Sequence, residues 1–205
     1  MPSPEDQEGR IESQLTFLLE IDGLKQIERM TKIRDGARRE NSAEHSWHLA
    51  LLAIVLVEHA AEPVDVARVV AMLLVHDLVE IDAGDTFAYD DVGHETKVER
   101  EVQAAERLYG LLPSDQGTTL RALWDEFERG DTADARFALA IDRLQPVLLN
   151  HANRGGPWHQ HGISRERVEA RNAVIGEGAP ALWAAALRRL DELDALGLFP
   201  GSPAV

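Results

Sequence analysis

The sequence has 205 residues, no cysteine and a formal net charge of -15 at pH 7, with 36 acidic against 21 basic side chains. This length suits one domain with a sizeable core, the charge opposes binding to nucleic-acid backbones or anionic membranes, and the lack of cysteine excludes disulfides and thiol nucleophiles. No run reaches the ~18 apolar residues of a membrane span and the first ten residues do not resemble a signal peptide, so we expect a cytoplasmic protein.

The first half of the chain has a helical pattern, with apolar side chains recurring every three or four positions. Asn41 or Ser42 can cap one of two further helices and Asp65 the other, and Pro63 and Gly84 can end them. These two helices are apolar nearly all round, which predicts a place at the centre of a bundle. The helices expected in this half cover about residues 11–22, 24–30, 41–60 and 65–81.

The second half alternates amphipathic segments with breaks. Pro113 and Gly130 separate successive helices, Asp131 or Thr132 can cap the next, and Ser164 another. The glycine-rich stretch 153–164 is expected to be a loop. No strand alternation or internal repeat is present, so the sequence predicts an all-α fold of roughly seven to nine helices. The helices expected here cover about residues 93–112, 114–129, 132–152, a segment after 164, and 179–197.

The adjacent pair His76-Asp77 lies in the apolar string "AMLLVHDLV". A buried ionised carboxylate is costly unless a positive charge neutralises it, and a metal ion explains this pair economically. His45 lies upstream and Asp142 downstream, which makes two imidazoles and two carboxylates available. Such a ligand set favours Mn, Fe, Co, Ni or Zn over Ca or Mg, and leaves the choice among the former open.

The order His45, His76-Asp77, Asp142 resembles that of the HD-domain metal-dependent phosphohydrolases. The strings "RRENSAEHSWH" and "HDLVEIDAGDTFAYD" resemble the subfamily of bacterial 5'-deoxynucleotidases and their eukaryotic HD-domain relatives. The resemblance implies one HD domain over residues 1–205, with a helical-bundle core at about 15–190 and flexible termini at about 1–9 and 200–205. It also implies that the four residues hold one divalent metal ion and that the protein is a homodimer.

Two further carboxylates match family residues near the substrate phosphate and the attacking water. Glu80 follows Asp77 by three positions, and Asp85 comes directly after Gly84, where the chain can turn back toward the same cavity. One carboxylate could hold or deprotonate the water while the other handles the leaving ribose oxygen. The sequence leaves open which does which.

Phosphoryl transfer also requires positive charge near the phosphate oxygens. The candidates are Arg29, Arg38 and Arg39, upstream of His45. Arg29 resembles an arginine that deoxynucleotidases place next to the sugar and phosphate. Met30 stands where those enzymes often carry tryptophan, which puts discrimination against ribose in doubt.

Aromatic and imidazole side chains elsewhere have plainer interpretations beside functional ones. Trp158 either stacks on a nucleobase or anchors its loop to the core, and both Arg39 and Trp158 join Arg29 as candidate substrate-binding residues. Three histidines lie around the glycine-rich stretch, and we expect them to be exposed polar residues and not ligands of a second metal: His151, His159 and His161. The other tryptophans fit core positions: Trp47, Trp124 and Trp183.

The expected function is metal-dependent hydrolysis of (deoxy)nucleoside 5'-monophosphates to nucleoside and phosphate, within nucleotide metabolism. One alternative is an HD phosphohydrolase acting on a nucleoside triphosphate or a cyclic diester. Another is a non-catalytic HD protein that binds a nucleotide or a metal. A small-molecule nucleotide is the expected partner, and nucleic acid and membranes are not.

Overall fold

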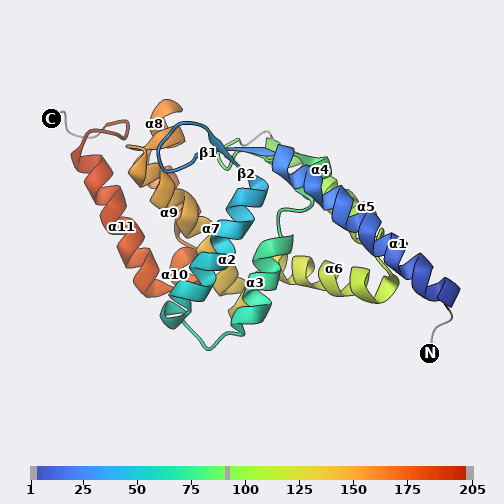
Figure 1. Ribbon diagram of the computed structural model, residues 1–205. Coiled ribbons are helices and arrows are strands. Elements are labelled where there is room, and N and C mark those ends of the chain that lie inside the picture. Colours follow the sequence, from blue (N-terminus) through green and yellow to red (C-terminus); the bar gives the residue numbers. More distant parts are fainter. Residues whose placement is uncertain (1–3, 91–92, 202–205) are drawn as a thin grey trace.

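Three apolar helices run together through the middle of the molecule: α2 (Ser42–Leu56), α3 (Val66–Val75) and α7 (Ala133–Ala152) (Figure 1). The computed structural model describes residues 4–90 and 93–201. The remaining elements are α1 (Pro4–Glu20), η1 (Ile21–Gln26), β1 (Glu28–Lys32), β2 (Arg39–Asn41), η2 (Val57–His59), α4 (Glu80–Ala83), η3 (Gly93–Glu95), α5 (Lys97–Tyr109), α6 (Ser114–Arg129), α8 (Gly156–Gln160), α9 (Arg165–Asn172), α10 (Ile175–Gly178) and α11 (Pro180–Ala195), where η denotes a 3-10 helix.

The central helices begin at side-chain caps that the sequence indicates. Asn41 accepts a hydrogen bond from the backbone N–H of Glu44, whose side chain accepts one from the N–H of Asn41 in return. The Asp65 side chain caps α3 by accepting from the backbone N–H groups of Ala67 and Arg68, and the Thr132 side chain caps α7. These caps satisfy donors that have no partner inside a helix, and so fix where each central helix starts.

Apolar side chains from these helices fill a single core. Leu49 of α2, Met72 of α3 and Phe137 of α7 are fully buried. Helices α1, α5 and α6 lie on one side of the central group and α8 to α11 on the other, with the far end of α1 extending beyond its neighbours (Figure 1). The packing therefore places α2, α3 and α7, which carry the His and Asp candidates, at the centre.

The all-α prediction is confirmed, apart from one small antiparallel sheet of β1 and β2 that the sequence did not predict. Its register pairs Glu28 with Asn41 and Lys32 with Arg39. The helix expected at 24–30 is therefore replaced by η1 and β1, because pairing with the strand across the next turn overrides the local helical pattern.

Three local expectations also need correction. The first helix begins at Pro4 instead of residue 11, so residues 4–9 of the segment expected to be flexible are helical; residues 1–3 and 202–205 lie outside the described residues. The expected loop 153–164 contains α8. Trp47, expected in the core, is 62% exposed because α2 turns this face outward. No helix in the described part of the chain is long and apolar enough to cross a membrane.

Candidate active site

Three of the expected metal ligands meet at the centre of the bundle. His45 lies in the first turn of α2, His76 at the end of α3 and Asp142 in the middle of α7, and all three are buried. His45 Nε2 lies 3.0 Å and His76 Nε2 3.8 Å from Asp142 Oδ1. Within residues 4–90 and 93–201, these three form the one group whose ligand atoms, all within 4.8 Å of one another, could hold a metal ion.

Asp77 lies against this group. Its Oδ1 is 3.1 Å from His76 Nε2 and its Oδ2 is 3.9 Å from His45 Nε2. Oδ2 also accepts a hydrogen bond from Arg29 Nη1 at 2.9 Å. The fourth expected ligand is thus within reach of the same centre and is oriented by an arginine.

The hydrogen bonds of the two imidazoles direct their free nitrogens at each other. His45 Nδ1 donates to Gln145 Oε1 at 3.2 Å, and His76 Nδ1 donates to the carbonyl oxygen of Leu73 at 2.9 Å. In the neutral form that binds a metal, with the proton on Nδ1, each Nε2 offers its lone pair at the centre of the cluster, an arrangement typical of metal-ligating histidines. His76 Nε2 is buried without a hydrogen-bond partner. The residues present therefore fit a divalent cation.

The electrostatics of the cluster favour positive charge at its centre. Burial lowers the pKa of His76, but the carboxylates of Asp77 and Asp142 outweigh it and raise that pKa to about 10. Burial raises the pKa of Asp142, but Arg143 and the two histidines hold it well below its usual range. Both shifts have the sign that a cation-binding site requires.

A cavity of about 260 Å³ opens beside the cluster, and both expected catalytic carboxylates line it. Ser42 Oγ donates a hydrogen bond to Glu80 Oε2 at 2.6 Å. Burial raises the pKa of Glu80 well above its ordinary value, with a further contribution from Asp77. The pKa of Asp85 is also raised, chiefly by burial. Gly84, at φ +72°, allows the chain to turn between them.

Comparison with known proteins agrees with this geometry. The family model described as "HD domain" matches residues 21–183. The chain belongs to the HD domain family. This HD domain is also similar to a solved structure described as a predicted metal-dependent phosphohydrolase from Magnetospirillum magnetotacticum MS-1, with 50% identity and a TM-score of 0.90, covering 94% of this chain and 97% of that one.

Among curated proteins, this HD domain is similar to 5'-deoxynucleotidase HDDC2 of Bos taurus, with 33% identity over 135 residues, and of Homo sapiens, with 31% identity over 137 residues. The matches cover 65% and 66% of this chain, and 64% and 66% of those relatives. A Pyrococcus furiosus protein of 20% identity, with a TM-score of 0.55 over 80% of this chain and 97% of that one, shares the fold.

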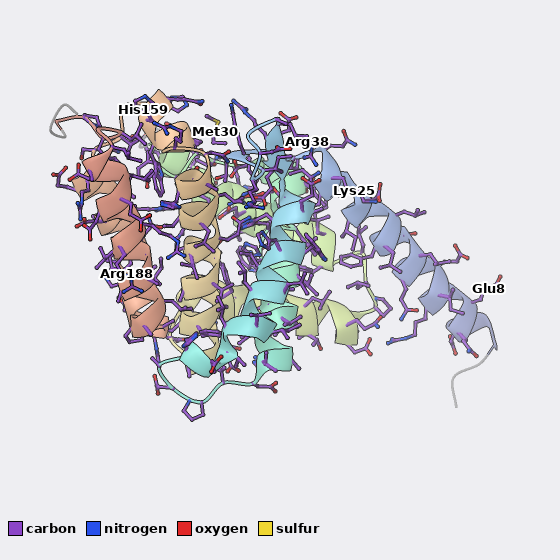
Figure 2. The ribbon with its side chains drawn as sticks, turned by 60° about the vertical axis from the view of Figure 1, so that its left-hand side comes forward. Glu8, Lys25, Met30, Arg38, His159 and Arg188 are labelled. Atoms are coloured by element: carbon purple, nitrogen blue, oxygen red, sulfur yellow. The ribbon has the colours of Figure 1, made fainter. Side chains whose placement is uncertain are left out.

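The structure brings together two of the three expected substrate-binding residues. Arg29 and the buried Trp158 of α8 line the cavity of the HD domain, as does Met30. Figure 2 shows Met30 at the same end of the bundle as His159 of α8. Arg39 is exposed on β2 and is not among the lining residues. Arg39 lies outside the cavity because it belongs to the hairpin of β1 and β2, which the sequence did not predict.

The glycine-rich segment does not assemble a second metal site among the described residues. His151 Nε2 lies 2.7 Å from Glu192 Oε2, and His159 Nδ1 donates to the carbonyl oxygen of Leu198. Arg38, the remaining upstream arginine, forms an ion pair with Glu44.

The sequence analysis did not predict that three further cationic side chains line the cavity. Lys97, Arg143 and Arg171 line it together with Tyr89. Arg143 directly follows the expected ligand Asp142 in the sequence, and this adjacency was the one feature that pointed to a place near the site. Lys97 and Arg171 belong to amphipathic, charged helices, where nothing distinguishes a cavity-facing side chain from a solvated one.

Proposed function

We propose that this chain is a phosphomonoesterase that uses one divalent transition-metal ion to hydrolyse (deoxy)nucleoside 5'-monophosphates to nucleoside and phosphate. The observation that carries the proposal is the buried His45, His76 and Asp142 group opening into a cavity that also holds Glu80 and Asp85. The printed names of the curated relatives and of the solved Magnetospirillum structure support the same reaction class.

In this proposal His45, His76, Asp77 and Asp142 hold the ion, which is Mn, Fe, Co, Ni or Zn. When bound, such an ion lowers the pKa of water and withdraws charge from a phosphoryl oxygen. Arg29 orients Asp77 through their 2.9 Å hydrogen bond and extends toward the substrate. A mixed imidazole and carboxylate shell supports a transition metal over Ca or Mg.

The two cavity carboxylates handle the protons. The water oxygen bonds to phosphorus as the bond from phosphorus to the 5' oxygen breaks, so one proton leaves the water and one reaches the leaving oxygen. Glu80 and Asp85 are the two groups that exchange these protons, and burial raises the pKa of both, so that either carboxyl group can carry a proton nearer neutral pH than an exposed one. The hydrogen bond from Ser42 holds the Glu80 carboxyl group in place.

We also propose a cytoplasmic location, and a homodimeric state as the family resemblance implies. The outward face of α2 supports self-association, because Trp47, Ile54 and Val55 are each more than half exposed there. Light scattering after size exclusion tests the oligomeric state.

The test of the reaction is phosphate release from ribo- and deoxyribonucleoside mono-, di- and triphosphates and from cyclic diesters. Chelated protein is reloaded separately with Mn, Co, Zn or Mg. Metal-dependent release confined to monophosphates would support the proposal. Release from triphosphates or diesters would replace its substrate, and no release from protein with bound metal would favour a binding protein.

Chelation also separates a catalytic ion from one that holds the fold together. The large apolar core should keep the chelated chain helical, so circular dichroism at 222 nm should persist while phosphate release stops and then returns on reloading. Loss of the helical signal together with activity would indicate a structural ion.

A further inference from the structure

Two arginines line the cavity without a close carboxylate partner of their own among the described residues. Arg143 of α7 lies 3.7 Å, from Nη1, to Oδ2 of Asp142. Arg171 of α9 has no carboxylate within ion-pairing distance in the described part of the chain, and its Nε is buried without a hydrogen-bond partner. Both side chains line the same cavity as the metal ligands.

The other cations of the cavity are already neutralised. Arg29 donates to Asp77, and Lys97 lies 2.9 Å from Glu101. The two arginines differ from these, because the nearest carboxylate to the pair is Asp142, which also belongs to the metal group. The charge of Arg171 and the donors of Arg143 that do not face Asp142 are thus available to an anion that enters the cavity.

The two guanidinium groups also lie close enough to affect each other. Burial lowers the pKa of Arg171, and the positive charge of Arg143 lowers it further, against the smaller opposing effects of Tyr89 and Asp142. Two like charges on a partly desolvated wall are unfavourable unless an anion lies between them. Guanidinium groups bind phosphate oxygens through paired N–H donors, which makes a phosphoryl group a suitable occupant.

We propose that Arg143 and Arg171 form a clamp that binds the terminal, dianionic phosphoryl group of the substrate next to the metal ligands. The inference rests on the proposed function and deepens it, since it names the residues that bind the phosphoryl group and select monoesters over diesters. The N–H groups of both arginines donate to non-bridging phosphoryl oxygens. A monoester carries two negative charges there near neutral pH, whereas a diester carries one, so the clamp selects terminal monoesters.

The experiment measures phosphate binding without turnover. Protein reloaded with Mn is titrated with inorganic phosphate and, separately, with deoxyadenosine, for the wild type, Arg143→Gln and Arg171→Gln. Each substitution removes charge-assisted hydrogen bonds and should weaken phosphate binding by roughly tenfold or more, with deoxyadenosine binding changed less than about twofold. Arg188→Gln is the matched control, because Arg188 is exposed on the outer helix α11 (Figure 2).

Selectivity gives a second readout. In the wild type, methyl phosphate should compete with inorganic phosphate better than dimethyl phosphate does. Arg171→Gln should reduce this difference between the inhibition constants of the two esters. Arg171→Lys, which keeps the charge but not the paired donors, should lie between the two. Circular dichroism and Mn affinity, measured on each variant, check that fold and metal site are intact.

Several outcomes would overturn the clamp. Unchanged phosphate binding in both Gln variants would do so, as would a loss of deoxyadenosine binding larger than the loss of phosphate binding, which would place the nucleoside there instead. A loss of Mn affinity equal to the loss of phosphate binding in both variants would reduce the arginines to positioning Asp142.

The clamp and the proposed function fail separately. Wild-type protein that binds phosphate in an arginine-dependent manner, yet releases none from any nucleotide, retains the clamp and loses the nucleotidase activity. Protein that hydrolyses nucleoside monophosphates equally well as wild type and as Arg171→Gln retains the activity and loses the clamp.

Discussion

Gln145 Oε1 accepts a hydrogen bond from His45 Nδ1 at 3.2 Å, while Nε2 of the same amide donates to Glu40 Oε1 at 2.6 Å. Glu40 therefore fixes which end of the amide faces His45, and the amide fixes which imidazole nitrogen carries the proton. All three side chains are buried. The chain Glu40, Gln145, His45 leaves His45 Nε2 free to ligate a metal ion, as such supporting hydrogen bonds do in known metal sites.

Gln145→Leu should lower the affinity for Mn by about 10-fold to 100-fold, because the His45 tautomer and ring orientation are no longer fixed. Competition with a metallochromic chelator measures the affinity. Gln14→Leu is the control, since Gln14 of α1 forms its hydrogen bond with Gln116, away from the site. Equal affinities for wild type and Gln145→Leu, with both proteins folded, would show that the amide does not position His45.

Glu80→Gln should retain Mn affinity within a few-fold and lose about 100-fold or more in kcat for the nucleotide that the wild type hydrolyses, since the amide cannot transfer the proton. His45→Ala and Asp77→Ala should instead lose metal and activity together. Glu8→Gln, on the exposed outer part of α1 (Figure 2), is the matched control. Full turnover by Glu80→Gln would remove Glu80 from the reaction.

Gly84→Ala should destabilise the protein by about 1–3 kcal/mol, although a methyl group at this position would meet no atom within 4 Å. The cost comes from φ +72°, which residues with a Cβ rarely adopt. Urea denaturation measures it. Gly9→Ala is the matched control: its added methyl group also meets nothing, but Gly9 is helical, so alanine should stabilise by about 0.5–1 kcal/mol. Equal effects of the two substitutions would contradict a backbone origin.

Glu126→Gln should remove part of the acid sensitivity of folding. The hydrogen bond from Arg68 lowers the pKa of Glu126 in the folded state, and Thr132 Oγ1 adds a second hydrogen bond. A carboxyl group with a lowered folded pKa stabilises the protein above its unfolded pKa of about 4.3, and this contribution disappears as pH falls through the folded value.

The difference in urea midpoint between wild type and Glu126→Gln should therefore be largest near pH 7 and shrink below about pH 4.3. Taking the difference cancels the other carboxyl groups that titrate in the same range. The exposed Arg68 side chain keeps the effect modest. A difference that grows on acidification would reverse the assigned sign.

The sequence by itself determined the helical class, the central place of α2 and α3 and the cap at Asp65, and it narrowed the caps of α2 and α7 to two neighbouring residues each. These are local properties: an apolar face and a capping side chain act within a few residues of the position that carries them. The identity of the candidate metal ligands was also local in part, since the His76-Asp77 pair in an apolar helix requires a compensating charge wherever that helix packs.

Only the tertiary structure decided what surrounds that pair. The β1 and β2 hairpin depends on pairing across a turn, and it leaves Arg39 exposed while Arg29 reaches Asp77. Arg143 and Arg171 come from helices α7 and α9 and line the same cavity, which no periodicity along the chain encodes. Charges are placed by the packing of distant helices, so the sequence could name the centre of the site but not the cations around it.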